Sequence, residues 1–435
     1  MTKPIQFLKL AIGAIGLAAS APALAAGTSV QCGHLLDQPG QSPRGASTIE
    51  IAADGTIVAI HEGKIQIEGT DLVDLGDKFC LPGLIDSHVH LTSELGPKGR
   101  LYAVTRSDAD WAMSAVLFSR RTLMAGFTSV QDVGARGDDA IYAVRDAIAR
   151  GDIAGPRILA AGKTISVSGG HGDGRHGYSE AVAASLLSPA ICDGPDDCRR
   201  AVRENIRRGA DVIKITATGG VLSNTAAGTE QQFFDDEMRD IVKAAHSMGR
   251  QVTAHAHGKG GIEAALRAGV DSIEHGTYLD AKTAALFKKH DAYLIPTVLA
   301  GATVVALAND PKSFLPEASR VKARQVGPQS IEMLRIARKA GVKIAFGTDS
   351  GVSHHGDNAQ EFVLMVEAGF TPMQAITSAT VSASDHLQIS DQTGTLEAGK
   401  QADLIAVGGS PLDDIKQLLD VDFVMKGGKV YKNKD

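Results

Sequence analysis

The stretch Leu81-Pro82-Gly83-Leu84-Ile85-Asp86-Ser87-His88-Val89-His90-Leu91 decides the fold. Pro82-Gly83 is a turn, and the residues after it have the pattern of a buried β-strand that is apolar on both faces. Side chains two residues apart on a strand point to the same side, so His88 and His90 can reach one point. Neutral imidazole is the commonest metal ligand, and two imidazoles on one strand supply half of a divalent-metal site. The alternative is that hydrogen bonds alone satisfy both rings.

The composition is typical of a glycine-punctuated α/β enzyme. Hydrophobic residues make up 43% of the 435 residues, glycine occurs 48 times, and aromatic residues contribute 4%. A nucleic-acid binder needs stacking aromatics and basic patches, whereas this chain has a formal net charge of -6. We therefore expect a small-molecule substrate and no nucleic-acid partner. The length suffices for one large catalytic domain and one small domain.

Residues 1–25 have the pattern of a signal peptide. Lys3 and Lys9 supply a positive region, residues 10–21 form a short apolar run, and Ala23-Leu24-Ala25 is a cleavage site. We expect export to a bacterial-type periplasm or to the medium, and no membrane contact after cleavage. The apolar run is short for a membrane span, although an uncleaved anchor is the alternative.

The four cysteines are expected to form disulfides, because export would permit them. Cys192 and Cys198 bracket a short loop, and a bridge between them is the first expectation. Cys32 and Cys80 both fall in the N-terminal β segment and could form the second. Other pairings and free thiols stay open, because connectivity does not follow from the sequence.

Both ends of the mature chain have the pattern of short β-strands joined by turns. Asp54-Gly55 and Lys426-Gly427-Gly428 are the turn signals between them. The strands are expected at residues 47–52, 56–60, 402–407, 421–425 and 430–431. Two β segments that flank everything else predict one small, discontinuous β-sandwich domain made of residues 26–82 and 394–435.

Between these segments, residues 83–393 alternate between strand-like and helix-like stretches. Strands are expected within residues 84–91, 128–133, 157–161, 211–217, 251–257, 271–275, 292–297 and 342–349. About eight βα units in succession predict a (β/α)8 TIM barrel, an α/β fold with a parallel sheet closed on itself. A doubly wound sheet is the alternative, but no Gly-x-Gly-x-x-Gly motif follows an early strand.

Polar and charged residues lie late in these apolar strands, where a barrel carries its chemistry. They are His88, His90, Lys214, His255, His257, His275 and Asp349. Charged groups are almost never fully buried unless they are paired or bound to a metal. One such residue is often structural, but the whole set indicates a metal site.

Lys214 is the most informative of these residues. An unmodified ammonium would be repelled by cations and would not bind them. A lysine carboxylated by carbon dioxide is an anionic carbamate whose two oxygens can bridge two cations. A lysine paired with an acidic residue at the barrel rim is one alternative. A Schiff-base lysine is another, which the metal-ligand spacing of the histidines disfavours.

These motifs resemble those of the metal-dependent amidohydrolase superfamily, and the resemblance covers essentially the whole mature chain. The matching segments are residues 81–90, 213–215, 253–258, 273–276, 347–350 and 394–404. Within the superfamily, the sequence is similar to the imidazolonepropionase-like branch, which includes Xaa-Pro dipeptidases, carboxypeptidases and amidases that hydrolyse ochratoxin. Imidazolonepropionase itself does not use a bridging lysine, so Lys214 favours the dipeptidase-like members. The resemblance also implies a homo-oligomer assembled through barrel helices.

The resemblance implies two divalent cations and a role for each ligand. It places one cation on His88, His90 and Asp349, and the second on His255 and His275. Carboxylated Lys214 would bridge the two. His257 should face the same way as His255 and could instead bind substrate or water in catalysis. Zinc is the expected metal, because imidazole and carboxylate ligands suit it and it is redox-inert.

Such a site predicts the hydrolysis of an amide or peptide bond. Two cations would lower the pKa of a shared water and give a bridging hydroxide, while one of them polarises the scissile carbonyl. Asp349 would accept the proton and deliver it to the leaving amine, unless it is only a turn carboxylate.

We expect release of a C-terminal amino acid from a dipeptide or an N-acyl amino acid, with ochratoxin A among the candidates. One alternative is a cyclic amide, imine or lactone hydrolase of the imidazolonepropionase type. A non-catalytic periplasmic metal or solute binder is the other.

The loops after the strands are expected to select the substrate. Residues 168–178 are glycine-rich and carry His171 and Arg175, which could grip a substrate carboxylate, although a solvated surface loop is the alternative. Gly219-Gly220 would let the substrate approach the backbone closely. Tyr278 could donate a hydrogen bond to the developing oxyanion or serve only in packing.

Overall fold

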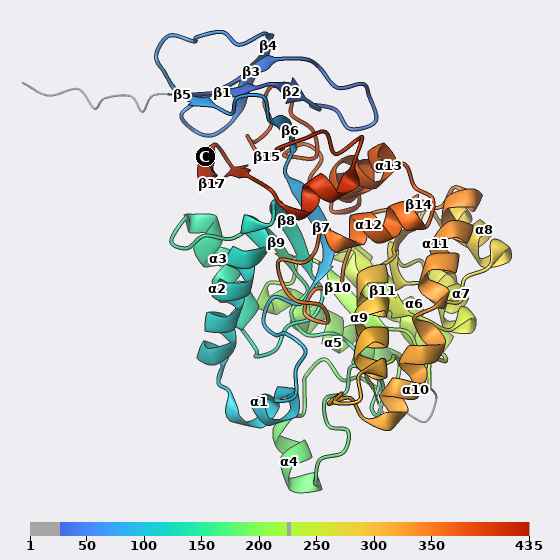
Figure 1. The fold of residues 1–435 in the computed structure, drawn as a ribbon. Helices are drawn as coiled ribbons and strands as arrows, with labels where there is room; N and C mark the ends of the chain where they lie inside the picture. The colour runs from blue at the N-terminus through green and yellow to red at the C-terminus, as the bar shows by residue number, and fades with distance from the viewer. Residues whose placement is uncertain (1–26, 224–227, 435) are drawn as a thin grey trace, which may run out of the picture.

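The computed structural model describes residues 27–223 and 228–434, so the predicted signal peptide lies outside the described residues (Figure 1). Eight strands follow one another through the middle of the chain in parallel pairs. They are β7 (Leu84–Val89), β8 (Phe127–Asp132), β9 (Arg157–Ala160), β10 (Ile213–Thr216), β11 (Val252–Ala256), β12 (Ser272–His275), β13 (Tyr293–Ile295) and β14 (Lys343–Ile344).

These strands form a three-stranded sheet, β7-β8-β9, and a five-stranded sheet, β10 to β14, which meet along both edges. At one seam Ile165, just after β9, pairs in parallel with Ile215 of β10. At the other seam Val89 of β7 pairs in parallel with Ser350, just after β14. The chain therefore has a TIM-barrel-like α/β fold.

Helices surround the strands, and all of them except the short α1 bury part of their surface. They are α1 (Gly99–Thr105), α2 (Asp108–Met124), α3 (Ala140–Arg150), α4 (Glu180–Ser185), α5 (Pro195–Arg208), α6 (Asp235–Ser247), α7 (Lys259–Ala268), α8 (Ala281–His290), α9 (Val298–Asn309), α10 (Glu317–Val326), α11 (Gln329–Ala340), α12 (Gln360–Glu367), α13 (Pro372–Thr377) and α14 (Ala383–His386). Phe127, Phe346 and Phe362 are fully buried, and their rings pack in succession between strands and helices. Within the described residues, none of the helices has the length and apolar character that crossing a membrane requires.

Two helical segments depart from a simple alternation of one strand and one helix. The last helical segment of the barrel is interrupted by a π-helical turn, η1 (Ser378–Ser382), between α13 and α14. Hydroxyls there bond backward to carbonyls, as Thr380 does to Ile376, and such bonds compete with the regular helical ladder. In addition, α9 and α10 form a helical excursion between β13 and α11 that the pattern did not predict.

The chain ends form two further sheets, which lie together at the top of Figure 1. Their orders are β4-β3-β1-β5 and β17-β16-β15-β6-β2. The strands are β1 (Gly27–Cys32), β2 (His34–Leu35), β3 (Ser47–Ile51), β4 (Ile57–Glu62), β5 (Thr70–Asp74), β6 (Phe79–Pro82), β15 (Leu404–Val407), β16 (Phe423–Lys426) and β17 (Lys429–Asn433), with the short η2 (Ile415–Leu419) before β16. One buried cluster contains residues of both sheets, among them Val30, Ile49, Leu404 and Phe423. The division into domains at residues 82 and 394 stays a prediction.

Gly83 joins these sheets to the barrel. Strand β6 pairs antiparallel with β15, and the chain continues through Gly83 directly into β7. A Cβ atom at Gly83 would lie 2.2 Å from the Thr128 hydroxyl oxygen on the neighbouring strand. Only glycine therefore lets the first barrel strand enter so close to the second.

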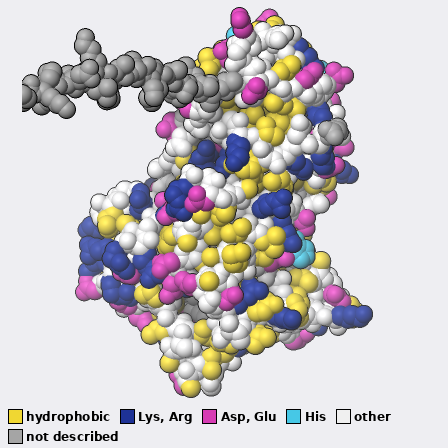
Figure 2. Space-filling model, turned by 90° about the vertical axis from the view of Figure 1, so that its left-hand side faces the viewer, with side chains coloured by type: hydrophobic (Ala, Val, Ile, Leu, Met, Phe, Trp, Pro, Cys, Tyr) yellow, Lys and Arg dark blue, Asp and Glu magenta, His cyan; other side chains and the backbone are white. Residues whose placement is uncertain are grey.

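The side of the molecule formed by α1 and α2 carries exposed apolar side chains. They are Leu101, Val104, Met113 and Leu117. Figure 2 looks at the left-hand side of Figure 1 and shows apolar side chains gathered between charged ones. Patches of this kind often mark protein contacts. The homo-oligomer implied by the resemblance stays a prediction.

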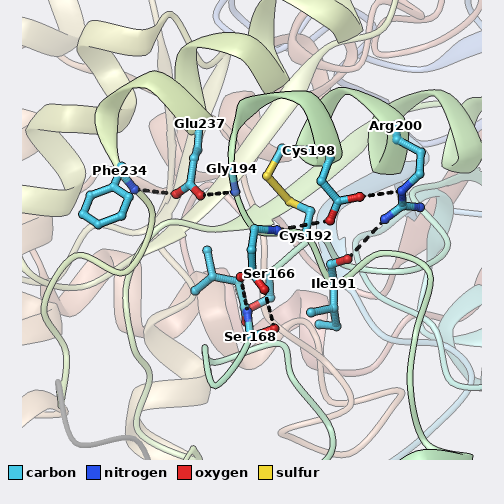
Figure 3. The surroundings of a disulfide bond; sticks show 12 residues. Ser166, Ser168, Ile191, Cys192, Gly194, Cys198, Arg200, Phe234 and Glu237 are labelled. Atoms are coloured by element: carbon cyan, nitrogen blue, oxygen red, sulfur yellow. Dashed lines mark hydrogen bonds and ion pairs between the residues drawn. A yellow bond between two sulfur atoms is a disulfide. The ribbon is translucent and has the colours of Figure 1, made fainter.

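Both expected disulfides are confirmed. Cys32–Cys80 joins β1 to β6 and so connects the two terminal sheets. Cys192–Cys198 joins the loop after β9 to the first turn of α5, beside Ser166 and Gly194 (Figure 3).

Removing the Cys32–Cys80 bridge is expected to destabilise the protein more than removing Cys192–Cys198. The bridges close 48 and 6 residues of chain, and constraining a longer loop removes more entropy from the unfolded state. We expect losses of about 4 and about 2 kcal/mol for the paired cysteine-to-alanine variants. Urea unfolding of the oxidised wild type and both double variants measures the difference. Equal losses would contradict the prediction.

Candidate active site

The ends of the barrel strands bring the predicted ligands together in two groups. His88 lies on β7, His90 and Asp349 follow β7 and β14, and their ligand atoms lie within 4.8 Å of one another. The same holds for the second group, which is His255, His257 and His275. The rings of His88 and His275 have centroids 5.3 Å apart, so the two groups adjoin.

Lys214 extends from β10 into the same space. Its charge acts on His88 of the first group and on His255 and His275 of the second. The Nζ atom is buried, and no hydrogen-bond partner for it exists among residues 27–223 and 228–434. Burial lowers the pKa of the Lys214 amine. A buried amine without a partner is costly, so this position indicates a group that the protein's own side chains do not supply.

Three residues at the strand ends have left-handed backbone conformations that side chains rarely adopt. The φ angles are 70° at His275, 58° at Asp349 and 48° at Thr297. A regular strand would send Glu274 and His275 to opposite faces, but the turn at His275 breaks the alternation and both side chains reach the interior. Strained residues of this kind cluster at functional sites.

The histidine rings are held through their Nδ1 atoms. His90 bonds the Gly134 carbonyl at 2.7 Å, and His257 and His275 bond the hydroxyls of Thr277 and Thr297 at 2.8 and 2.6 Å. His88 Nδ1 bonds the Glu274 carboxylate. In metal sites such bonds fix the ring and direct Nε2 to the ion. These bonds leave Nε2 of each of the four rings available to an ion, a substrate or water.

Two buried carboxylates that the sequence analysis did not assign support the site. Glu274 also accepts a hydrogen bond from Thr253. Burial alone would raise its pKa, but the positive charges of Lys214 and His88 lower the pKa of Glu274 to about 2. Asp86 accepts from the His88 backbone N–H at 3.0 Å and from the Thr348 hydroxyl at 2.6 Å, which ties β7 to the loop that carries Asp349. Both acids were visible in the sequence as charges inside apolar strands.

The loop after β9 places His171 directly against the second group. The His171 ring stacks on His255 with centroids 4.3 Å apart, and its backbone N–H donates to Gln232 at 2.8 Å. Burial lowers the pKa of His171 to about 3, so the ring is neutral. A Cβ atom at Gly220 would lie 2.4 Å from this ring. Gly220 therefore makes room for His171, in addition to the predicted approach of substrate at Gly219-Gly220.

Arg175 is engaged elsewhere. Its Nε and Nη2 donate to the two oxygens of Asp173 at 2.8 and 2.7 Å, so its charge is already balanced. The carboxylate-gripping role predicted for Arg175 is therefore not part of our proposal. Tyr278 donates its backbone N–H to the His257 carbonyl at 3.0 Å and packs against an apolar cluster that includes Val221 and Val304.

The sequence pattern of the amidohydrolase family matches residues 79–431. The chain belongs to the amidohydrolase family. Its sequence is 34% identical to the ochratoxinase of Aspergillus niger over 381 residues, which is 81% of this chain and 75% of that protein. The family assignment confirms the predicted resemblance and makes this protein a hydrolase that acts on amide bonds.

Solved structures agree with the sequence relatives. A Xaa-Pro dipeptidase with methionine bound in its active site superposes with a TM-score of 0.88 and 41% identity, covering 94% of this chain and 100% of that one. A prolidase complexed with N-methylphosphonate-L-proline gives a TM-score of 0.85 and 30% identity, with the same coverage.

The residues present fit the metal dependence that is typical of amidohydrolases. His88, His90 and Asp349 offer two imidazoles and one carboxylate at one point, and the second group offers three imidazoles. These are the donors that zinc and similar divalent ions prefer. The unpartnered amine of Lys214 is explained if it carries a further ligand.

A buried acid on the barrel wall fixes the element next to His275. Helix α9 begins at Val298, directly after the Thr297 hydroxyl that holds His275. The two carboxyl oxygens of Glu361 on α12 accept from the backbone N–H groups of Val298 and Leu299 at 2.9 and 2.6 Å. It thereby satisfies two of the N–H groups that a helix start leaves free. Burial raises the pKa of Glu361 to about 8.

Replacing Glu361 with Gln is expected to flatten the pH dependence of stability. The folded protein keeps the Glu361 proton up to about pH 8, whereas the unfolded chain loses it near 4.5, so the folded state binds the extra proton between these values. The wild-type free energy of unfolding should therefore fall as pH rises through this window, with a contribution of about 1 kcal/mol per pH unit from this group.

Urea unfolding across this window measures the effect. The decline should be shallower in Glu361→Gln and unchanged in Glu367→Gln, an exposed acid at the end of the same helix. Identical slopes in all three proteins would contradict the assignment.

Proposed function

We propose that this amidohydrolase is a binuclear metal enzyme that hydrolyses an amide or peptide bond and releases a C-terminal amino acid. The observation that carries the proposal is the adjoining pair of ligand groups with the buried, unpartnered amine of Lys214 beside them. The names of the related proteins support the same reaction class, since they act on a dipeptide ending in proline or on ochratoxin. Dipeptides, N-acyl amino acids and ochratoxin A are the proposed substrates.

The proposed cofactors are two divalent ions, with zinc as the first candidate. His88, His90 and Asp349 would hold one ion, and His255 and His275 the other. Lys214 would join them as a carbamate, which forms when its neutral amine adds carbon dioxide and releases a proton. When bound, such ions polarise a carbonyl and lower the pKa of water.

The chain's own residues carry out the proton transfers and the positioning. Asp349 accepts the proton of the attacking water and delivers it to the leaving amine, which must leave as a neutral group. His257 stands two residues beyond His255, with Nδ1 held by Thr277, so its Nε2 is available to the substrate or to water. The neutral ring of His171 stacks on His255 and covers that face of its ring.

We also propose that the enzyme works after export, with the segment before residue 26 removed, and that it assembles as a homo-oligomer. Both disulfides are compatible with an oxidising compartment. The N-terminal sequence of the secreted protein and its mass in solution test these two points.

Replacing Lys214 with Ala is expected to abolish metal binding by the two adjoining ligand groups. Wild-type protein purified with bicarbonate should hold two ions per subunit, and the variant should lose metal and activity together. Elemental analysis measures this, with Lys426→Ala as the control, because Lys426 is a half-buried lysine of β16 that donates to the Gly155 carbonyl. A single ion that is indifferent to Lys214 would favour the ring-opening, mononuclear alternative.

Replacing Asp349 with Asn is expected to lower turnover by about a thousandfold or more, because the amide accepts no proton. Release of free amino acid from a panel of dipeptides and N-acyl amino acids, with metal present, is the measurement. The exposed Asp357, on the same loop, serves as the control through Asp357→Asn. Absence of amino-acid release by the wild type across the panel would overturn the proposed function. Ring opening without a second product would indicate a cyclic-amide hydrolase. The absence of any turnover would indicate a binding protein.

A further inference from the structure

Lys322 is a cation at the mouth of the site that none of the steps above uses. It lies on α10, in the helical excursion after β13, and its ammonium reaches across to the loop after β10. There it donates to the carbonyl of Gly220 at 2.6 Å and to the carbonyl of Ser223. The side chain is half-buried.

A short chain of contacts connects this ammonium to the ligand groups. Gly220, which accepts its hydrogen bond, is in contact with the ring of His171, and that ring stacks on His255. The ammonium is also close enough to lower the pKa of both His171 and His257. Lys322 therefore stands on the same side of the site as the second ligand group.

Apolar packing joins the excursion to the loops at the strand ends. Apolar residues of α9 and α10, such as Val304 and Ala323, form one cluster with Val221. Tyr278 and Val352 pack against that cluster from the loops that follow β12 and β14. Three strand-end loops thus meet the excursion, and Val221 lies between the two carbonyls that Lys322 binds.

The charge of Lys322 is not balanced. An ammonium has three donors, and two are used on neutral carbonyls. Among residues 27–223 and 228–434, no carboxylate forms an ion pair with it. Arg175, the other candidate cation near these loops, is taken by Asp173. A half-buried charge with a spare donor, and with no carboxylate to pair with, is suited to an anionic ligand.

We propose that Lys322 recognises the α-carboxylate of the C-terminal amino acid and thereby restricts the enzyme to substrates that end in a free carboxylate. This inference rests on the proposed function and names the residue that selects the substrate class. The ammonium keeps its two carbonyl contacts, which hold it in place, and directs the third N–H to the carboxylate. The apolar cluster beside it favours a C-terminal residue with an apolar side chain.

The test compares two substrates that differ only in this charge. N-acetyl-L-phenylalanine carries the carboxylate, and N-acetyl-L-phenylalaninamide replaces it with a neutral amide of the same shape. Release of acetate reports cleavage of either compound. The wild type should prefer the carboxylate, and Lys322→Met should lose about ten- to hundredfold in kcat/KM on the carboxylate, mainly through KM, with little change on the amide.

The control is Arg324→Met. Arg324 lies on the same helix and also donates to a backbone carbonyl, that of Ala308, but two residues correspond to about 200° around a helix, so it faces away from Lys322. It should leave the carboxylate preference unchanged. If Lys322→Met weakens both substrates equally, Lys322 only supports the loop after β10, and the proposal is wrong.

The outcomes also separate this inference from the proposed function. Cleavage of both substrates with no carboxylate preference in the wild type keeps the amide hydrolase and overturns the role of Lys322. If the wild type cleaves neither compound, titration calorimetry of the same two compounds measures their binding without turnover. Tighter binding of the carboxylate that disappears in Lys322→Met would then support the recognition role, and equal binding would overturn it.

Discussion

The site depends on the cost of burying imidazole, carboxylate and amine groups at one end of a barrel. Such groups lose their hydration on burial, and each one that finds no hydrogen-bond partner lowers the free energy of unfolding. Most of them are satisfied by the chain, as His88 is by Glu274 and His275 is by Thr297. Lys214 is not, and its unpartnered Nζ lies beside both ligand groups. That imbalance is what indicates a ligand supplied from outside the chain.

The partners of the ligands explain the local structure around them. Thr297 can hold His275 because the chain turns left-handed there and α9 starts at the next residue, with Glu361 closing its first turn. Asp86 holds the backbone at His88 and the hydroxyl of Thr348 together, so the first and last barrel strands present their ligands to one point. The orientations of the His88 and His275 rings therefore depend on the turns and seams of the barrel around these two residues.

The loops at the strand ends place further residues around the ligand groups. His171 covers His255 from the loop after β9, and Gly220 leaves the space that this requires. The α9–α10 excursion meets the same loop at Gly220, with Lys322 and an apolar cluster. An amide hydrolase needs both kinds of contact, because one part of the substrate must meet the reacting groups while another part is held by its charge and shape.

The sequence by itself predicted the order of the barrel strands and the polar residues that lie late in them, because these depend on local spacing. It favoured the Cys192–Cys198 bridge across a short loop but left the partner of Cys32 open. His-x-His on an apolar strand, and charges that recur at strand ends, are visible without coordinates. Only the tertiary structure decided how the charges are used. It paired Arg175 with Asp173, turned both Glu274 and His275 inward by breaking strand alternation, and brought Lys322 to a loop 99 residues away in sequence. The Lys322 contact depends on how distant segments pack, and the Arg175 pair depends on how the loop after β9 folds; the sequence pattern specifies neither.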